Sequence, residues 1–293
     1  MIIIKLYGGL GNHMTQLALY CCLKNYLPNQ KIKLDYNKFK YTKFHNGLRA
    51  ESVFNLPFTF NIKSSYSFYE RIYYRLFEMI KEFRYKISGV KVIRSSVREN
   101  FKKIVDEISD NSVYVIDGVW NSSNYFLGYD EIVKNLFQIK PVILSDNAKK
   151  NANAIHSIDS VALHVRRADY INSQFTSLTD TSYYKDAIKV IQNRINIKQL
   201  NIFVLSDDIK WCEDNLSFLS SHKVTFVKGT KDYEDLYIMT MASNIVMANS
   251  TFSWWGAYLS EAKNIICPIN FFSAKKLTKE YLRFICKDDW ILI

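Results

Sequence analysis

The strongest constraint on the fold is a regular alternation of apolar runs and helical patterns in the second half of the chain. The expected strands are short apolar runs near Val161, Ile202, Val224, Ile245 and Ile265. The helices expected between and after them lie at about residues 183–194, 209–216, 233–242 and 252–262. Strands that alternate with helices are typical of a parallel, doubly wound α/β sheet. Such sheets bind ligands at the carboxyl ends of their strands, which is where functional residues are expected.

The first half of the chain is less regular but begins with the same kind of unit. Residues 2–6 form an apolar run, which the segment YGGLGNHM and a helical pattern follow. Residues 31–35 and 113–117 predict further strands. We therefore expect an α/β fold with two domains, residues 1–155 and 156–293. A chain of 293 residues that is 48% hydrophobic is long enough to bury a core in each domain.

The stretch VALHVRRADY ends an expected strand with a His, two Arg and an Asp in close order. Alternate residues of a strand point to the same face, so His164 and Arg166 share one side and Arg167 takes the other. A guanidinium suits a phosphate held by two donors, which makes Arg166 the candidate anion ligand. The alternative is a structural network of ion pairs, which is the commoner origin of such a cluster.

A glycine-rich turn follows the first expected strand. Gly8, Gly9 and Gly11 permit a close approach of the backbone to a ligand, and a helix is expected to begin beyond Asn12. The free N–H groups of a helix amino terminus attract negative charge. The spacing matches neither the dinucleotide fingerprint nor the P-loop. A simple tight turn is the alternative interpretation.

A second candidate anion site precedes the helix expected at about residue 252. Asn249, Ser250 and Thr251 are residue types that cap helix amino termini, and an apolar segment starts at Phe252. The alternative is a capped core helix whose tryptophans fill the interior, and this is the interpretation we prefer for the WW pair at 254–255.

These segments resemble the alpha-1,2-fucosyltransferases of glycosyltransferase family eleven. The resemblance rests on GGLGN at 8–12, GVWNSSNYF at 118–126, HVRRADY at 164–170, FVLSDDIKWCEDNL at 203–216, the segment 233–259 and the closing segment 268–272. The segments follow the order of the family over nearly the whole chain.

The resemblance implies an inverting enzyme that transfers L-fucose from GDP-fucose to the 2-hydroxyl of a terminal galactoside, without a metal or other cofactor. The implied fold is of the GT-B type, with two Rossmann-like domains facing across a cleft. Residues 1–155 would then take the acceptor and residues 156–293 the GDP-fucose. The implied acceptor is a galactoside-terminated oligosaccharide or a lipid-linked glycan, as in a bacterial surface polysaccharide.

The same resemblance assigns residues to the donor, and the chemistry of the transfer points to candidates for catalysis. The residues that it places around the donor are Gly9, Gly11, Asn12, His164, Arg166, Ser206, Asp207, Asp235, Asn249, Ser250, Thr251 and Phe252. Arg166 would meet the charge that grows on the departing GDP. Asp169 is the candidate base for the acceptor hydroxyl, although we prefer a role in orienting an arginine, and His13 is the next candidate.

The net charge of +11 favours an anionic partner, such as a nucleotide sugar, an anionic lipid or a nucleic acid. The sequence has no nucleic-acid reader motif, and its aromatic residues follow core periodicity, so we expect no nucleic-acid partner. A nucleic-acid-binding protein is therefore the weaker alternative. Another alternative is a relative that binds glycans but has lost the transfer activity.

Residues 64–84 predict a long amphipathic helix. One stripe of this helix holds Tyr69, Ile72, Tyr73, Leu76, Phe77, Ile80 and Phe83, and the other face is basic. An aromatic stripe at helical spacing usually lies in the core, and that is the expected position. The alternative is a helix that rests on a membrane surface, where lipid-linked sugar acceptors are found.

The cysteines and the absence of long apolar runs bear on the cellular compartment. The five cysteines are odd in number and show no CxxC pair, so we expect reduced thiols rather than disulfides or a zinc site. No segment reaches the roughly 18 apolar residues of a membrane span, and no secretion signal is evident. The expectation is a cytoplasmic protein, with peripheral contact at the inner membrane as the alternative.

Overall fold

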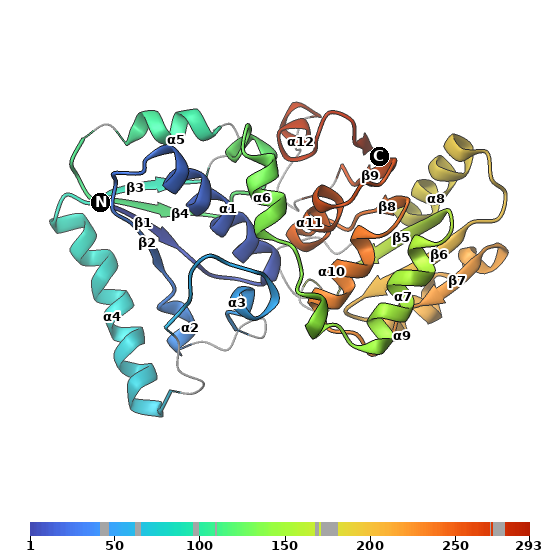
Figure 1. Cartoon of the computed structure of the whole chain (residues 1–293), viewed down its shortest axis with the longest axis horizontal. Helices are drawn as coiled ribbons and strands as arrows, with labels where there is room; N and C mark the ends of the chain where they lie inside the picture. The colour runs from blue at the N-terminus through green and yellow to red at the C-terminus, as the bar shows by residue number, and fades with distance from the viewer. Residues whose placement is uncertain are drawn as a thin grey trace. The chain divides into compact units, whose positions relative to one another are not determined.

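The computed structural model describes residues 1–41, 47–61, 66–95, 100–108, 110–167, 170, 181–269, 271 and 279–293. The chain forms two compact units, Met1–Lys140 and Pro141–Ile293 (Figure 1). The boundary lies at Lys140 rather than at residue 155. The helix α7 (Asp146–His156) contacts the strand β5 (Ser160–Val165) and the helix α10 (Asp232–Thr240), so it belongs to the second unit.

The first unit holds a parallel sheet with the strand order β2-β1-β4-β3. Its strands are β1 (Ile2–Lys5), β2 (Ile32–Asp35), β3 (Lys91–Arg94) and β4 (Tyr114–Asp117). The surrounding helices are α1 (Leu10–Tyr26), α2 (Lys38–Tyr41), α3 (Ala50–Val53), α4 (Phe68–Ile87), α5 (Phe101–Glu107) and α6 (Asp130–Leu136). In a parallel α/β sheet of this kind, ligands bind at the carboxyl ends of the strands.

The second unit holds a parallel sheet with the order β10-β9-β8-β5-β6-β7. The other strands of this sheet are β6 (Asn201–Ser206), β7 (Lys223–Phe226), β8 (Asn244–Val246), β9 (Asn264–Cys267) and β10 (Ile291–Leu292). The remaining helices are α8 (Ser182–Ile195), α9 (Ile209–Asn215), α11 (Thr251–Leu259) and α12 (Lys279–Ile285). The strands and helices expected from the alternating pattern are therefore confirmed.

The core of the second unit forms on both faces of its central strands. All six residues of β5 are buried, as expected for a parallel strand with helices on both sides. Trp254 and Trp255 of α11 are fully buried, which confirms their expected place in the interior. Trp254 stacks on Tyr258 with ring centroids 5.0 Å apart, and its indole N–H donates to the Ile285 carbonyl at 2.7 Å.

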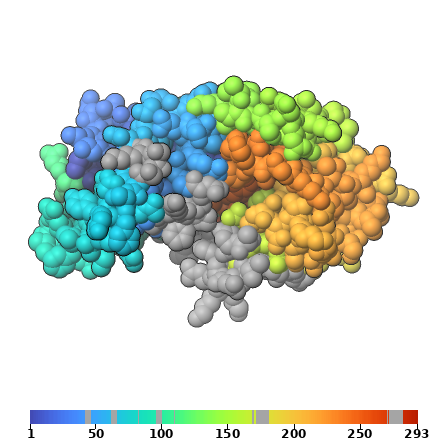
Figure 2. All heavy atoms as spheres, turned by 90° about the horizontal axis from the view of Figure 1, so that it is seen from below, coloured from blue at the N-terminus to red at the C-terminus, as the bar shows by residue number. Residues whose placement is uncertain are grey.

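The aromatic stripe of α4 was expected in the core, and the structure shows that this expectation is wrong. Tyr69 is 81% exposed and Phe83 is 65% exposed. Figure 2 shows α4, in cyan, at the surface of the molecule. The reason lies on the opposite side of the helix, where Lys81 forms ion pairs with Asp35 of β2 and with Glu78. These polar contacts hold α4 against the first unit, so its apolar side faces outward.

The expectation of reduced thiols is wrong for one pair of cysteines. Cys267, the last residue of β9, forms a disulfide with Cys286, which directly follows α12. Cys21, Cys22 and Cys212 are free. The pairing could not be predicted, because 19 positions separate the two residues and no spacing motif marks them.

Candidate active site

Three strand ends of the second unit hold the predicted donor residues of that unit other than Asp235, which lies in α10. β5 pairs with β6 on one side and with β8 on the other. From β5, the chain order runs outward in both directions, so the ligand crevice of this fold lies at the ends of β5 and β8. The segments that come together at the three strand ends are 164–167, 206–208 and 249–252.

The two adjacent arginines have different environments. Arg166 Nε lies 3.1 Å from Asp207 Oδ2, and its side chain is about one quarter exposed. Arg167 Nε lies 3.3 Å from Asp208 Oδ2, and its guanidinium carbon lies 4.1 Å from the centre of the Trp211 ring. The Arg167 backbone N–H also donates to Asp207 Oδ1 at 2.9 Å. Arg167 is thus packed between an aromatic ring and a carboxylate, whereas Arg166 is open to a ligand on part of its surface.

His164 is buried at the end of β5, with only 3% of its surface exposed. Its ring centroid lies 5.3 Å from that of Phe252 at the start of α11. Burial lowers the pKa of His164 to about 3, and the neighbouring Arg166 contributes to the shift, so the imidazole is neutral at pH 7. Its Nδ1 has no hydrogen-bond partner within the described part of the chain. A buried nitrogen without such a partner can form a hydrogen bond with a bound ligand.

The turn before α11 is fixed by its own side chains. Ser250 Oγ accepts the Phe252 N–H at 3.2 Å and caps the helix. Ser253 Oγ accepts the Ala248 N–H at 2.9 Å and ties the helix back to the end of β8. The helix amino terminus therefore keeps a set position beside β5, where its dipole favours negative charge.

Asp235 lies in the first turn of α10 and has an unusual carboxyl group. Burial raises the pKa of Asp235 to about 7, against a hydrogen bond from Thr230 that favours the charged form. Nearby carboxylates, including that of Asp207, add to the rise. The carboxyl group therefore titrates much closer to neutral pH than an ordinary Asp, and such shifts are typical of groups at functional sites.

The glycine turn of the first unit has a strict requirement for glycine at one position. Gly8 has φ +90°, and a Cβ there would lie 2.3 Å from Asn12 Nδ2. The helix α1 begins at Leu10 with Gly9 as its N-cap, so Gly11 and Asn12 lie in its first turn. The helix thus starts earlier than expected.

Gln16 connects the strand ends of the first unit, and the sequence did not point to it. This residue is fully buried. Its Oε1 accepts the Tyr7 N–H at 3.0 Å, and its Nε2 donates to the Gly118 carbonyl at 3.2 Å. Gln16 therefore fixes the segments that follow β1 and β4 to the helix α1.

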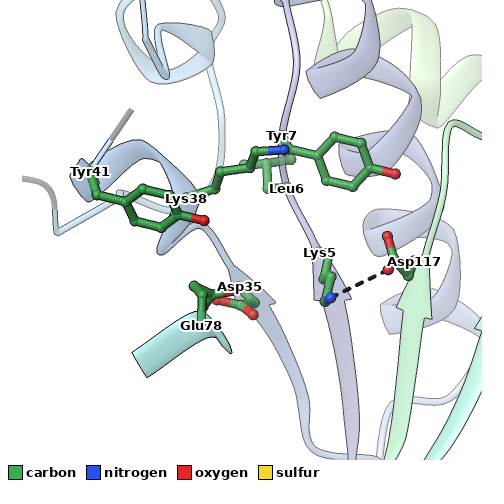
Figure 3. A pocket seen from close by; sticks show the side chains of 8 residues that line it. All are labelled: Lys5, Leu6, Tyr7, Asp35, Lys38, Tyr41, Glu78 and Asp117. Atoms are coloured by element: carbon green, nitrogen blue, oxygen red, sulfur yellow. Dashed lines mark ion pairs between the residues drawn. The ribbon is translucent and has the colours of Figure 1, made fainter. Parts of the chain in front are cut away.

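An open pocket lies at the carboxyl ends of β1, β2 and β4 (Figure 3). Its lining residues are Lys5, Leu6, Tyr7, Asp35, Lys38, Tyr41, Glu78 and Asp117. Lys5 Nζ lies 3.3 Å from Asp117 Oδ2. Burial and the Asp117 carboxylate, which accepts a hydrogen bond from the phenol, raise the pKa of Tyr7. The pocket therefore combines carboxylates, ammonium groups and phenols.

Of the two candidates for the catalytic base, only His13 lies within the described residues. Asp169 lies outside the described residues. His13 is buried in α1, and its ring packs edge-on against Phe39 with centroids 5.0 Å apart.

The whole chain, residues 1–293, matches the model of a family described as glycosyl transferase family 11. The chain belongs to glycosyl transferase family 11. It is similar to an alpha-1,2-colitosyltransferase of Escherichia coli, with 31% identity over 100% of this chain and 99% of that protein. It is also similar to the O-antigen biosynthesis glycosyltransferase WbnK of Escherichia coli, with 26% identity over 98% of each.

Among solved structures, the chain resembles the NodZ alpha-1,6-fucosyltransferase of Bradyrhizobium co-crystallized with GDP. The TM-score is 0.50 at 12% identity, over 90% of this chain and 93% of that one. This likeness confirms the GT-B type of fold that the sequence led us to expect. Family membership makes the chain a glycosyltransferase.

The pocket of this family 11 glycosyltransferase was not predicted from its sequence. One signal was available, because Asp35 and Asp117 each end an expected strand, as Arg166 follows the strand β5. Glu78 comes from a distant helix, and no motif connects it to the strands.

Proposed function

We propose that this glycosyltransferase transfers L-fucose from GDP-fucose to the 2-hydroxyl of a terminal galactoside, with inversion and without a metal or other cofactor. The observation that carries the proposal is that Arg166 and the amino terminus of α11 meet at the ends of β5 and β8. Together they offer guanidinium and backbone N–H donors to a diphosphate. The family resemblance supplies the identity of the sugar and the linkage.

The guanine base would be recognised by carboxylates of the second unit. Guanine presents N–H donors on its pairing edge, which an ionised carboxylate accepts. Asp235 and Asp207 interact electrostatically, and Asp207 contacts Arg166, so these carboxylates and the diphosphate site are neighbours. Ser206 lies at the same strand end, where its Oγ accepts the Asp208 N–H at 3.0 Å.

In the transfer step, the bond between the anomeric carbon and the β-phosphate oxygen breaks while the acceptor oxygen forms the new bond from the opposite face. Negative charge grows on the departing GDP, and Arg166 with the α11 amino terminus would stabilise it without rearrangement. The proton of the acceptor hydroxyl must pass to a base. Asp169 is our first candidate for the base, although we prefer for it a role in orienting an arginine, and His13 is the second candidate.

The acceptor would use the pocket of the first unit. Carboxylates accept hydrogen bonds from sugar hydroxyls, and Asp35 and Asp117 line the pocket together with phenols, on either side of Lys5 of β1. A galactoside-terminated oligosaccharide or lipid-linked glycan fits this chemistry. The likeness to WbnK supports an acceptor in a bacterial surface polysaccharide.

A second donor is favoured by one observation. The colitosyltransferase relative matches the whole chain at 31% identity, and colitose differs from L-fucose only in lacking the 3-hydroxyl. GDP-colitose is therefore the alternative donor for the same site.

The test is incubation with GDP-fucose or GDP-colitose and a panel of β-galactosides, followed by linkage analysis of the products by NMR. We expect an α-1,2-linked product from GDP-fucose, and EDTA should leave turnover unchanged. A product only from GDP-colitose would transfer the proposal to that donor. GDP binding without any product would indicate a relative that has lost transfer. Activity lost in EDTA and restored by manganese would overturn the metal-free mechanism.

A further inference from the structure

One side of α4 is apolar and faces outward along the length of the helix. Its outward apolar side chains are each between 41% and 81% exposed. These are Phe68, Tyr69, Ile72, Tyr73, Leu76, Met79, Ile80, Phe83 and Ile87. We call these residues the outer face of α4. Large contiguous apolar surfaces are uncommon on soluble proteins and mark sites of interaction.

The opposite side of α4 fixes the helix in this orientation. Lys81 pairs with Asp35 of β2 and with Glu78, 3.4 Å away on the preceding turn. At the amino terminus, Ser67 and Glu70 form a reciprocal capping box. The helix also contacts α2. Turning the outer face inward would break these ion pairs, so its exposure belongs to the fold of the first unit.

Among the described side chains of α4, the exposed charges beside the outer face are of one sign. Among the α4 side chains that the structure describes, the exposed charged ones are Arg75, Arg84 and Lys86. The acidic ones, Glu70 and Glu78, are less exposed and are engaged in the capping box and in the pair with Lys81. The outer face therefore has a basic rim.

We propose that the outer face of α4 binds the surface of a lipid bilayer that contains anionic lipids. A helix with an apolar, aromatic face and a basic rim lies in the plane of the bilayer, with its rings among the lipid headgroups. Basic residues beside the surface add attraction to anionic lipids, and the chain carries a net charge of +11. Within the described residues, no helix has the length and apolarity that crossing a bilayer requires.

A second copy of the chain fits the outer face less well. In a symmetric dimer the same surface meets itself, so the basic rim of one copy would approach that of the other. An anionic bilayer supplies the opposite charge and covers the apolar residues at the same time.

The position of α4 gives membrane binding a consequence for the reaction. Glu78, on the inner side of the same helix, lines the pocket of the first unit. A bilayer under the outer face would bring lipid-linked glycans close to this pocket. This consequence rests on the proposed function, whereas binding to the bilayer does not.

The experiment is flotation of the full chain with vesicles of equal parts phosphatidylglycerol and phosphatidylcholine, compared with phosphatidylcholine alone. We expect binding to the anionic vesicles that high salt weakens. The variant Leu76→Gln/Ile80→Gln/Phe83→Gln should lose on the order of a hundredfold in partitioning. The variant Arg75→Gln/Arg84→Gln/Lys86→Gln should lose roughly fivefold per charge on anionic vesicles only.

A matched control removes exposed apolar side chains elsewhere. Leu127 and Val142 are 69% and 86% exposed and lie outside α4, so Leu127→Gln/Val142→Gln should bind vesicles like the wild type. All variants should melt at the wild-type temperature and turn over a soluble acceptor at the wild-type rate, which separates this test from that of the proposed function. The proposal is overturned if the wild type binds neither vesicle, or if the α4 variants bind as well as the control. One such result would show that the outer face is a dimer interface. The wild type would then be a dimer in solution that binds no vesicle, and the Leu76→Gln/Ile80→Gln/Phe83→Gln variant would be a monomer.

Discussion

The two parallel sheets differ in what they present at the carboxyl ends of their strands. In the second unit, the crevice between β5 and β8 holds Arg166 and the start of α11, which are donors of hydrogen bonds. In the first unit, the strand ends hold Asp35 and Asp117 together with phenols, and the carboxylates are acceptors. The same architecture thus carries complementary chemistry, and we assign the anionic donor to the second unit and the hydroxyl-bearing acceptor to the first.

The comparison also shows how each end is held together. In the second unit, short segments that directly follow β5, β6 and β8 make the site, and hydrogen bonds within the turn fix them. In the first unit, ion pairs join residues that are far apart in the chain, such as Lys5 with Asp117. Because the donor is assigned to the second unit and the acceptor to the first, substitutions in the two sites should affect the binding of different substrates.

The largest expected effect follows from replacing Arg166. Arg166→Ala should lower turnover by about a hundredfold or more, because loss of a donor to developing charge costs on the order of 3 kcal/mol. Arg166→Lys should recover little, since an ammonium cannot reproduce the paired N–H donors. The melting temperature should stay close to that of the wild type, because a partly exposed ion pair with Asp207 contributes little stability. Steady-state kinetics and calorimetry measure both quantities.

Arg167→Lys is the matched control for this substitution. Arg167 packs on Trp211 and pairs with Asp208, so this variant should keep part of its activity and melt at a lower temperature. An active Arg166→Ala enzyme would remove Arg166 from the site. Equal inactivation of both variants at unchanged melting temperature would place both arginines in it.

A smaller effect, on the other substrate, is expected from the first unit. Asp117→Asn should raise the KM of the acceptor about tenfold or more, since a hydrogen bond to a charged group contributes about 1.5–3 kcal/mol. The KM of the donor should not change. Asp110→Asn removes an exposed carboxylate of the same unit, paired with Lys91 outside the pocket, and should change neither KM. A rise in the donor KM of Asp117→Asn with no change for the acceptor would reverse the assignment of the two sites.

The smallest expected effect is a pH dependence of GDP binding. Because the pKa of Asp235 is raised to about 7, its carboxyl group is protonated at lower pH. It must lose this proton to accept hydrogen bonds from the guanine N–H groups. The Kd for GDP should therefore rise by up to about tenfold per pH unit below pH 7, and Asp235→Asn should flatten this profile. His164 does not titrate in this range, because its pKa is lowered to about 3. Calorimetric titrations at pH 6, 7 and 8 measure the effect, and an unchanged profile in Asp235→Asn would exclude Asp235 as its source.

Without nucleotide, the stability of the protein should depend on pH in the opposite sense. The folded state holds the Asp235 proton more tightly than the unfolded state, so this group stabilises the fold at low pH. Its contribution should be lost as the pH rises from about 4 through 7. Thermal melts of the wild type should show this loss, and Asp235→Asn should not.

The sequence predicted the second unit better than the first for a physical reason. The strand β5 is buried on both faces, so its apolar run is unbroken, and the residues that follow it are neighbours in the chain and in space. The pocket of the first unit joins Tyr7, Glu78 and Asp117, which become neighbours only when the sheet and α4 assemble. Periodicity alone therefore could not locate it.

The helix α4 shows the same limit of periodicity. The apolar stripe of α4 has the spacing of a core helix. The helix differs from a core helix in that its opposite, polar side contacts the first unit. The ion pair of Lys81 with Asp35 decides the orientation, and it connects residues 46 positions apart. By contrast, α11 carries no charged side chain, and it buries Trp254 and Trp255 as expected.

The most direct test of the division between the two units is a calorimetric titration of GDP into three proteins: the wild type, Arg166→Ala and Asp117→Asn. We expect the Kd for GDP to rise at least about tenfold in Arg166→Ala, because charged hydrogen bonds to the diphosphate are lost. It should stay within about twofold of the wild type in Asp117→Asn, and UDP should bind weakly to all three. Wild-type affinity in Arg166→Ala together with a large loss in Asp117→Asn would contradict the assignment of the donor to the second unit.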